Sequence, residues 1–388
     1  MENKLMQGWK EVELGDVAEF INGRAFKPSE WERKGKIIIR IQDLTGNIEN
    51  PNFTTQTFDN RYLVKKGDLL ISWSATLDAF IWNKEEGWLN QHIFKVVENK
   101  NLIDRKFLFY LVKNKIEDLK KETHGSTMKH ITKGNFNSIK FYLPPLQVQK
   151  HIVSILEKAG ELIRKRGDAN NLTKEYLQSV FYEMFSNKKF DEVILRELCL
   201  LITKGTTPTT YGHSFIDKGI NFLKIENIDK DGKILMNSLQ FISKEANELL
   251  KRSQLVENDI IFSIAGALGR VAIIKKEYLP ANINQAIAII RLKSDKKINK
   301  EYLEYYLRSE IVIKQTTENK RGVAQLNLNL EQIGNINVIL PPLGLQQKFA
   351  SIVEHVEKIK EKQKQSKGEI NTMFDSLMKQ AFNGELVK

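Results

Sequence analysis

The chain contains a tandem repeat, and this repeat constrains its fold more than any other feature. The segment Leu143-Pro144-Pro145-Leu146 recurs 197 residues later as Leu340-Pro341-Pro342-Leu343, and the match continues without a gap to Phe185 and Phe382. Upstream the match continues at a smaller offset, so the two copies differ by small loop insertions. The repeat therefore predicts that each copy has a variable globular part of roughly 140 residues and a better-matched helical part of about 40.

Both segments that follow the Pro-Pro pairs have the pattern of one long helix. Proline suits the first turn of a helix, and apolar residues such as Ile155, Leu162 and Tyr176 then recur in steps of three and four around a polar middle. Asn187 and Gly384, which tolerate a left-handed cap, end the two segments. The pattern is a heptad seam and predicts two helices of roughly 38 residues, ~57 Å long, that pair antiparallel as an intrachain coiled coil.

Further apolar residues lie on and beside this seam. One helix pair does not need all of them, so we expect helices of a partner subunit to pack there. The predicted subunit interface consists of Ile152, Leu156, Ile163, Leu177, Phe181, Phe349, Val353, Phe374 and Met378.

The globular parts have the pattern of mixed α/β domains. Short apolar runs predict strands at 37–39, 68–72, 93–97, 260–264 and 287–292. Amphipathic stretches predict helices at 107–119 and 302–313. The predicted fold class is α+β, with two pseudo-symmetric mixed α/β domains separated by two long antiparallel coiled-coil helices. The predicted boundaries are 1–143 for the first domain, 144–187 for the central helix, 188–340 for the second domain and 341–388 for the C-terminal helix.

The charge balance favours a polyanionic partner. Sixty Lys and Arg residues against 48 Asp and Glu residues leave a net charge of +12, and such a surplus attracts nucleic acid. Polar loops between the predicted strands carry the amide, hydroxyl and guanidinium groups that read base edges, with Lys for phosphates. The candidate DNA-binding residues of the first copy are Asn22, Arg24, Lys27, Arg40, Gln42, Trp73, Ser74, Thr76, Gln91, Ser126, Thr127 and Lys129. Those of the second copy are Lys204, Thr206, Thr207, Lys224, Asn227, Arg270, Gln285, Arg321, Ala324, Gln325 and Asn327.

The sequence offers no pattern for catalysis or metal binding. The Pro-Pro pairs lack the polar residue in front that an adenine methyltransferase needs, and no Gly-rich loop follows a strand in the way a nucleotide cofactor requires. The one cysteine, Cys199, lies in an apolar run and is expected to be a buried hydrophobic residue. His124 and His130 have no accompanying ligand pattern. We expect no catalytic site, metal or cofactor in this chain. No run is long enough for a membrane span or resembles a signal peptide, so a cytoplasmic protein is expected.

The order of variable domain, Leu-Pro-Pro, Gln-containing helix start and long helix resembles the specificity subunits of type I restriction–modification systems. The stretch from Met378 to Leu386 is also similar to the ending of that family, and the likeness covers the whole chain. The resemblance implies that each globular part is a target-recognition domain for one half of a bipartite site in double-stranded DNA. The Ser-Gly-type loop of the family is Ser-Ala-Thr after Trp73 here, and the second copy keeps the glycine as Gly266.

The resemblance also implies the partners. The helices would dock two methyltransferase subunits, which carry the S-adenosylmethionine, and motor-nuclease subunits would join through that complex. Two other functions are weighed against this one. A coiled-coil adaptor that binds only proteins would show no salt-sensitive duplex binding, and a fused modification enzyme would need the motifs that are missing.

Overall fold

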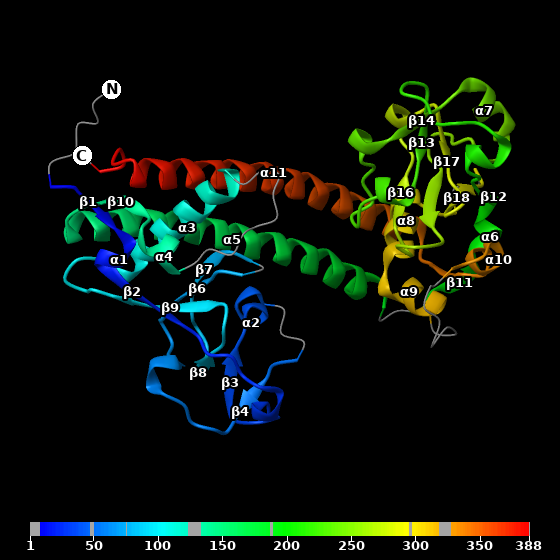
Figure 1. The fold of residues 1–388 in the computed structure, drawn as a ribbon. Coiled ribbons are helices and arrows are strands. Elements are labelled where there is room, and N and C mark those ends of the chain that lie inside the picture. Colours follow the sequence, from blue (N-terminus) through cyan, green and yellow to red (C-terminus); the bar gives the residue numbers. More distant parts are fainter. Residues whose placement is uncertain are drawn as a thin grey trace. The chain divides into compact units, whose positions relative to one another are not determined.

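The structure is a computed structural model, and it describes residues 8–46, 50–74, 76–122, 133–186, 189–294, 297–317 and 327–387. The chain forms two compact units, residues 1–169 with 363–388 and residues 170–362 (Figure 1). The predicted four-part division follows the order of the chain, whereas these units follow the packing. Each unit combines one globular domain with half of each long helix, because the apolar faces of the helices are buried against the domains.

The first unit is built on two four-stranded sheets and a two-stranded one. The sheet orders are β2-β9-β6-β7, β4-β3-β8-β5 and β1-β10. The strands are β1 Lys10–Glu13, β2 Ala18–Asn22, β3 Lys36–Ile39, β4 Phe53–Thr54, β5 Leu63–Val64, β6 Leu69–Ser72, β7 Asp78–Ile81, β8 Gly87–Leu89, β9 Ile93–Glu98 and β10 Lys140–Leu143. The helices are α1 Leu14–Val17, α2 Ile41–Thr45, α3 Arg105–Glu122 and α4 Lys133–Asn137, followed by α5 Leu146–Phe185, which continues into the second unit.

The second unit has a similar arrangement, with a three-stranded sheet in place of the second four-stranded one. Its sheet orders are β12-β18-β15-β16, β14-β13-β17 and β11-β19. The strands are β11 Asp191–Ile194, β12 Cys199–Lys204, β13 Ile220–Leu223, β14 Gln240–Ile242, β15 Ile260–Ser263, β16 Val271–Ile273, β17 Ala281–Ile283, β18 Ile287–Leu292 and β19 Asn337–Leu340. The helices are α6 Leu195–Leu198, α7 Lys244–Leu249, α8 Lys300–Arg308, α9 Glu310–Thr317 and α10 Leu330–Gly334, followed by α11 Leu343–Phe382.

The predicted strands all form, and the predicted fold class is confirmed. Strands β6 and β15 are buried along their whole length, as expected for apolar runs at the centre of a sheet. The helix predicted at 302–313 is wrong as one element, because the chain leaves the α region at Ser309. The Ser309 hydroxyl donates to the Tyr306 carbonyl at 2.6 Å, a local bond that competes with continuation of the helix. Cys199 is buried, as expected.

The two long helices are antiparallel. In the first unit the start of α5 packs with the end of α11, since Ile152 and Ala381 belong to one core. In the second unit the order is reversed, and the rings of Phe181 and Phe349 lie 5.4 Å apart. Both helices therefore begin against one domain and end against the other, as the sequence predicted.

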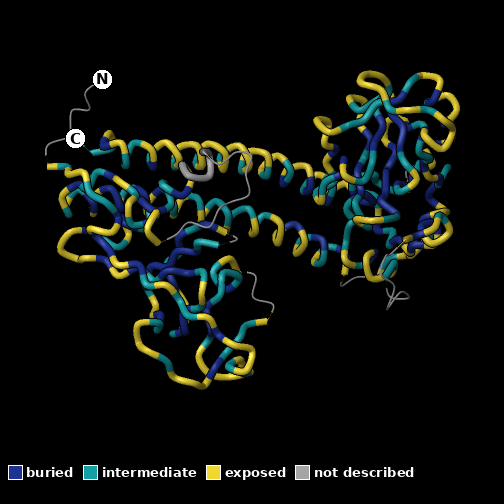
Figure 2. The backbone as a smooth tube through the Cα atoms, viewed as in Figure 1, coloured by how far each residue is buried: buried dark blue, intermediate teal, exposed yellow. Residues whose placement is uncertain are grey.

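The predicted seam is wrong in detail. Leu162 and Tyr176 are 48% and 54% exposed, whereas Leu156 and Phe181, which we placed beside the seam, are buried. Each half of a long helix packs against its own domain, and this packing decides which face of the helix is buried. Apolar residues next to the predicted seam therefore become the buried ones. No residue from 164 to 171 is buried, and Arg164, Lys165, Asp168 and Asn171 in the polar middle of α5 are exposed (Figure 2).

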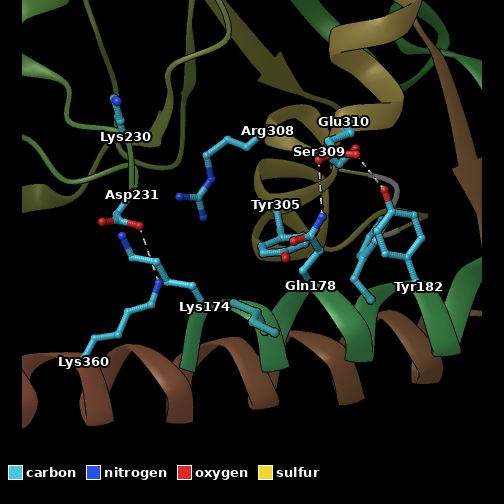
Figure 3. A pocket seen from close by; sticks show the side chains of 12 residues that line it. Lys174, Gln178, Tyr182, Lys230, Asp231, Tyr305, Arg308, Ser309, Glu310 and Lys360 are labelled. Atoms are coloured by element: carbon cyan, nitrogen blue, oxygen red, sulfur yellow. Dashed lines mark hydrogen bonds and ion pairs between the residues drawn. The ribbon is translucent and has the colours of Figure 1, made fainter. Parts of the chain in front are cut away.

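Polar contacts attach the second domain to both helices within the second unit. Lys360 on α11 lies 3.6 Å from Asp231, and Gln178 and Tyr182 on α5 donate to Glu310 at 3.4 and 3.5 Å (Figure 3). These residues line a cavity of about 220 Å³ beside Arg308. One buried carboxyl beside Arg308 has a raised pKa.

That carboxyl is Glu304 on α8. It is 7% exposed and lies 2.9 Å from the Arg308 guanidinium. Burial raises the pKa of Glu304 to about 7, and the opposing effect of Arg308 is smaller. Because the folded-state pKa lies above the unfolded value of 4.5, the folded state binds the proton more tightly.

We predict that this group makes stability fall as pH rises. The free energy of unfolding should decrease between about pH 4.5 and 7, by at most about 3 kcal/mol. Glu304→Gln should remove this part of the pH dependence, whatever its effect on stability at one pH. Urea unfolding of both proteins at pH 5 and pH 8 measures it, and equal pH dependence in wild type and variant would contradict the prediction.

Candidate DNA-recognition surface

Three turns of the first unit meet at one edge of the sheet. Strands β2 and β6 end at this edge, and the antiparallel strand β9 begins there, so the turns after Asn22, after Ser72 and before Ile93 are neighbours. The parallel pair β3 and β8 also ends there, which adds Arg40 and Asn90. We call residues 22–24, 40–42, 73–77 and 90–92 the first recognition edge, of which residue 75 is outside the described ranges.

Backbone hydrogen bonds tie these turns together. Arg24 N–H donates to the Leu89 carbonyl at 3.1 Å, and Gln91 N–H donates to the Arg24 carbonyl at 2.8 Å. Trp73 N–H donates to the His92 carbonyl at 3.1 Å. Turns that are distant in the sequence therefore form one surface with a defined backbone.

The second unit builds the same edge. Strands β12 and β15 end where β18 begins, and the parallel strands β13 and β17 end nearby. Asn284 N–H donates to the Leu223 carbonyl at 3.1 Å, and Ile264 N–H donates to the Ala286 carbonyl at 2.8 Å. Residues 204–207, 224–228, 264–270 and 284–285 form the second recognition edge.

A buried serine closes the matching turn in each edge, a role that the sequence analysis missed. Ser263 donates to the Ala267 carbonyl at 2.6 Å and accepts the Arg270 N–H at 2.8 Å. Ser72 donates to the Thr76 carbonyl and accepts the Asp78 N–H at 3.2 Å. Both serines are 0% exposed. The repeat of a polar residue at the end of an apolar strand was the signal that could have identified them.

A glycine lets each edge close. A Cβ atom on Gly23 would lie 2.0 Å from the Asn90 carbonyl oxygen, and one on Gly205 would lie 2.0 Å from the Ile283 carbonyl oxygen. No side chain fits at that distance, so glycine is required where the backbones approach. The two copies share this requirement although their flanking residues differ.

Many predicted contact residues present polar groups at the edges. Asn22, Thr76, Gln91, Lys204 and Gln285 are exposed, and so is Lys27 just beyond the first edge. Gln42, Ser74, Thr206, Thr207 and Lys224 are partly exposed. The Thr207 hydroxyl donates to the Gln285 side chain. Trp73 stacks on Phe94 with 5.8 Å between the ring centroids, and its Nε1 donates to Asn22 at 3.3 Å.

Other predicted contact residues support the edges from within. Asn227 is 1% exposed and accepts the Lys224 N–H at 2.8 Å, so its assignment as a DNA contact is corrected. The Arg270 guanidinium donates to the carbonyls of Ile225 and Ile228 at 3.2 and 2.6 Å. It therefore links two turns of the second edge. Arg270 is partly exposed, and its assignment as a DNA-binding residue stays a prediction.

The arginines of the first edge are held in a similar way. Arg24 lies over the rings of Phe58 and Phe26, 4.1 and 4.7 Å from their centroids, and pairs with Glu30 at 2.9 Å. Arg40 donates to the Asn50 carbonyl at 2.8 Å. Both side chains are partly exposed and position the turns through these contacts, and their assignment as DNA-binding residues stays a prediction.

Six candidate DNA-binding residues, from one further polar loop in each copy, lie outside the described residues: Ser126, Thr127, Lys129, Arg321, Ala324 and Gln325. Asn327 is described and exposed. Its neighbour Leu328 donates its N–H to the Ile264 carbonyl at 2.8 Å, so the end of this loop joins the second recognition edge.

The predicted subunit interface needs a correction. Ile152, Leu156, Leu177, Phe181, Phe349, Val353 and Met378 are all less than 10% exposed within this chain. Packing of each helix half onto its own domain uses these side chains, so they cannot also form an open docking surface. Ile163 and Phe374 are partly buried. Among the described residues, the exposed large apolar side chains of the long helices are Leu162, Leu172, Tyr176, Ile359 and Met373.

Comparison with known proteins identifies a family that shares this arrangement. The sequence model of the type I restriction modification DNA specificity domain matches twice, at residues 6–173 and 187–372. The chain is 26% identical to the type I restriction enzyme EcoBI specificity subunit of Escherichia coli, over 97% of this chain and 86% of that protein. It is 25% identical to the MjaVIII specificity subunit of Methanocaldococcus jannaschii, over 99% of this chain and 94% of that protein.

Solved structures share the fold. A chain from a study of complex assembly and conformational transition of the type I R-M system matches with a TM-score of 0.66 and 18% identity, over 99% of this chain and 100% of that one. The type I restriction-modification S subunit of M. genitalium matches with a TM-score of 0.54 and 14% identity, over 98% and 99%. Two matches to the specificity domain, one per repeat, agree with the two recognition edges, and the chain belongs to the family of type I restriction–modification DNA specificity subunits.

Proposed function

We propose that this chain is the DNA-recognition subunit of a type I restriction–modification enzyme, in which each recognition edge reads one half of a bipartite duplex site. The observation that carries the proposal is the repeated edge, where the same strand ends present different side chains in each copy. Buried shared residues such as Ser72 and Ser263 serve the scaffold, and the exposed polar residues of each edge read the bases of its own half-site. The chain itself is non-catalytic and acts in the cytoplasm.

The test uses a matched pair of glutamines. Gln91 and Gln285 follow Asn90 and Asn284 at equivalent positions, and both are exposed. In the assembled enzyme, Gln91→Ala should relax specificity in one half-site and Gln285→Ala in the other, with a cost of about 1–3 kcal/mol for each lost base contact. Methylation of a substrate library randomised in both halves measures this. If either variant relaxed the sequence specificity of both half-sites equally, the proposal that each edge reads its own half-site would be contradicted.

We further propose that the helices dock two methyltransferase subunits, which supply the S-adenosylmethionine and recruit motor-nuclease subunits. Leu162 corresponds to Ile359 and Tyr176 corresponds to Met373 at the 197-residue offset of the repeat. All four side chains are between 41% and 54% exposed. Exposed apolar residues that recur in both copies indicate two equivalent docking sites, because each copy offers the same surface.

This arrangement predicts a stepwise loss of subunits. Tyr176 and Ile359 both belong to the second unit, whereas Leu162 and Met373 belong to the first. Replacing one pair with alanine should remove one methyltransferase copy, and replacing both pairs should remove two. The mass of the assembled complex measures the result. An unchanged complex in the fourfold variant would place the docking surface elsewhere.

A further inference from the structure

In each copy, one fully buried side chain of the long helix is hydrogen-bonded to the recognition domain. Gln149, in the first turn of α5, accepts the Asp104 N–H at 2.8 Å, immediately before α3 begins. Its Nε2 donates to the Leu102 carbonyl at 2.9 Å and to the Pro144 carbonyl at 2.8 Å. The amide oxygen and the amide nitrogen therefore connect the domain helix, the loop before it and the Pro-Pro junction.

The second copy repeats this arrangement atom for atom. Gln346 accepts the Asn299 N–H at 2.8 Å and donates to the carbonyls of Lys297 and Pro341 at 3.2 and 2.7 Å. Both glutamines are 0% exposed. A buried side-chain amide is costly unless it is hydrogen-bonded, so its retention in both copies indicates a specific role.

The position of these glutamines decides what they can do. Each domain enters its long helix through a Pro-Pro pair, which lacks backbone N–H donors. The Gln side chain supplies donors at that junction and spans to the N-terminus of the domain helix. Asp104 and Asn299 cap α3 and α8 with their own side chains, so the glutamine holds the residue that fixes the start of each domain helix.

We propose that Gln149 and Gln346 are positioning residues that lock each recognition domain at a fixed angle to its long helix and thereby define the half-site spacing that the enzyme accepts. The proposal rests on the proposed function in its second part, since a spacing exists only if both edges read one duplex. Loss of a lock leaves the recognition edge and the apolar packing of the helix intact, but lets the angle between the domain and the helix vary more widely. Half-site sequences should then stay the same while the preferred spacer becomes less defined.

The first test measures the lock without DNA. In wild type, the Asp104 and Asn299 amides should exchange slowly with deuterium. Gln149→Met, which keeps the length of the side chain without its hydrogen bonds, should speed exchange at Asp104 about ten- to hundredfold. The control is Gln147→Met, two residues away and exposed. Fast exchange at Asp104 in the wild-type protein would overturn the proposal without any variant.

The second test measures the angle within the first unit. Spin labels on Glu19→Cys and Lys165→Cys, both exposed, report the distance between the domain and α5. Burial raises the pKa of the native Cys199 thiol to about 12, so this cysteine should stay unlabelled. Gln149→Met should broaden the distance distribution and Gln147→Met should not. An unchanged distribution in Gln149→Met would overturn the lock.

The third test connects the lock to function. Methylation of substrates that differ only in spacer length should be sharply selective for the wild-type complex and for Gln347→Met, an exposed neighbour. It should be less selective for Gln149→Met and Gln346→Met, with unchanged half-site sequences. If the distance distribution broadens but spacer selectivity stays sharp, the positioning role in spacing is overturned. If the wild-type complex showed no sequence selectivity at all, the proposed function itself would be refuted.

Discussion

Duplex binding by the full chain should weaken by about a thousandfold or more when salt is raised from about 50 to about 200 mM, as for proteins that neutralise several phosphates. The positive charge that neutralises phosphates comes from the net charge of +12, including the exposed Lys27 and Lys204 at or beside the recognition edges. Each neutralised phosphate releases counterions, so the logarithm of the affinity should fall linearly with the logarithm of the salt concentration. Fluorescence anisotropy with a labelled duplex measures the slope.

Matched variants separate charge from sequence reading. Lys204→Gln should reduce the salt slope by about one unit and weaken binding to all sequences alike. Gln285→Ala should leave the slope unchanged and affect one half-site only. An affinity that does not change between low and moderate salt would favour a coiled-coil adaptor that binds proteins alone.

Four residues inserted into α5 between residues 164 and 171 should lengthen the preferred spacer by about one to two base pairs. Four residues add about 6 Å and slightly more than one helical turn, so the helix faces stay nearly in register, and DNA advances about 3.4 Å per base pair. None of these eight residues is buried, so the insertion disturbs neither core. The half-site sequences should not change, because no recognition edge is altered.

The control is an insertion of two residues at the same place. Two residues rotate the following helix by about 200°, which should turn its apolar face away from its packing partner and abolish activity rather than shift the spacer. Methylation of substrates with stepped spacer lengths distinguishes the two results. A four-residue insertion that keeps the original preference with full activity would show that the helices do not set the spacing.

The recognition edges show how far the sequence analysis could reach. The turns were identified correctly because glycines and polar residues interrupt apolar strand patterns at matching places in both copies. The pattern could not separate the exposed Gln91 from Arg24, which two aromatic rings enclose. Both are polar residues in a turn, and only the surrounding side chains decide which of them faces outward.

The sequence alone determined the repeat, five of the central strands and the two long helices, because periodicity and punctuation are local properties. The antiparallel pairing followed from the presence of two equivalent helices in one chain. Only the tertiary structure decided which face of each helix is buried. Leu156 and Leu162 are both apolar residues of one helix, yet the first is 0% and the second 48% exposed. Tertiary packing also decided the distant partners of Gln149 and Gln346. Besides a nearby proline carbonyl, each buried amide bonds to groups more than forty residues away, and no local pattern records that contact.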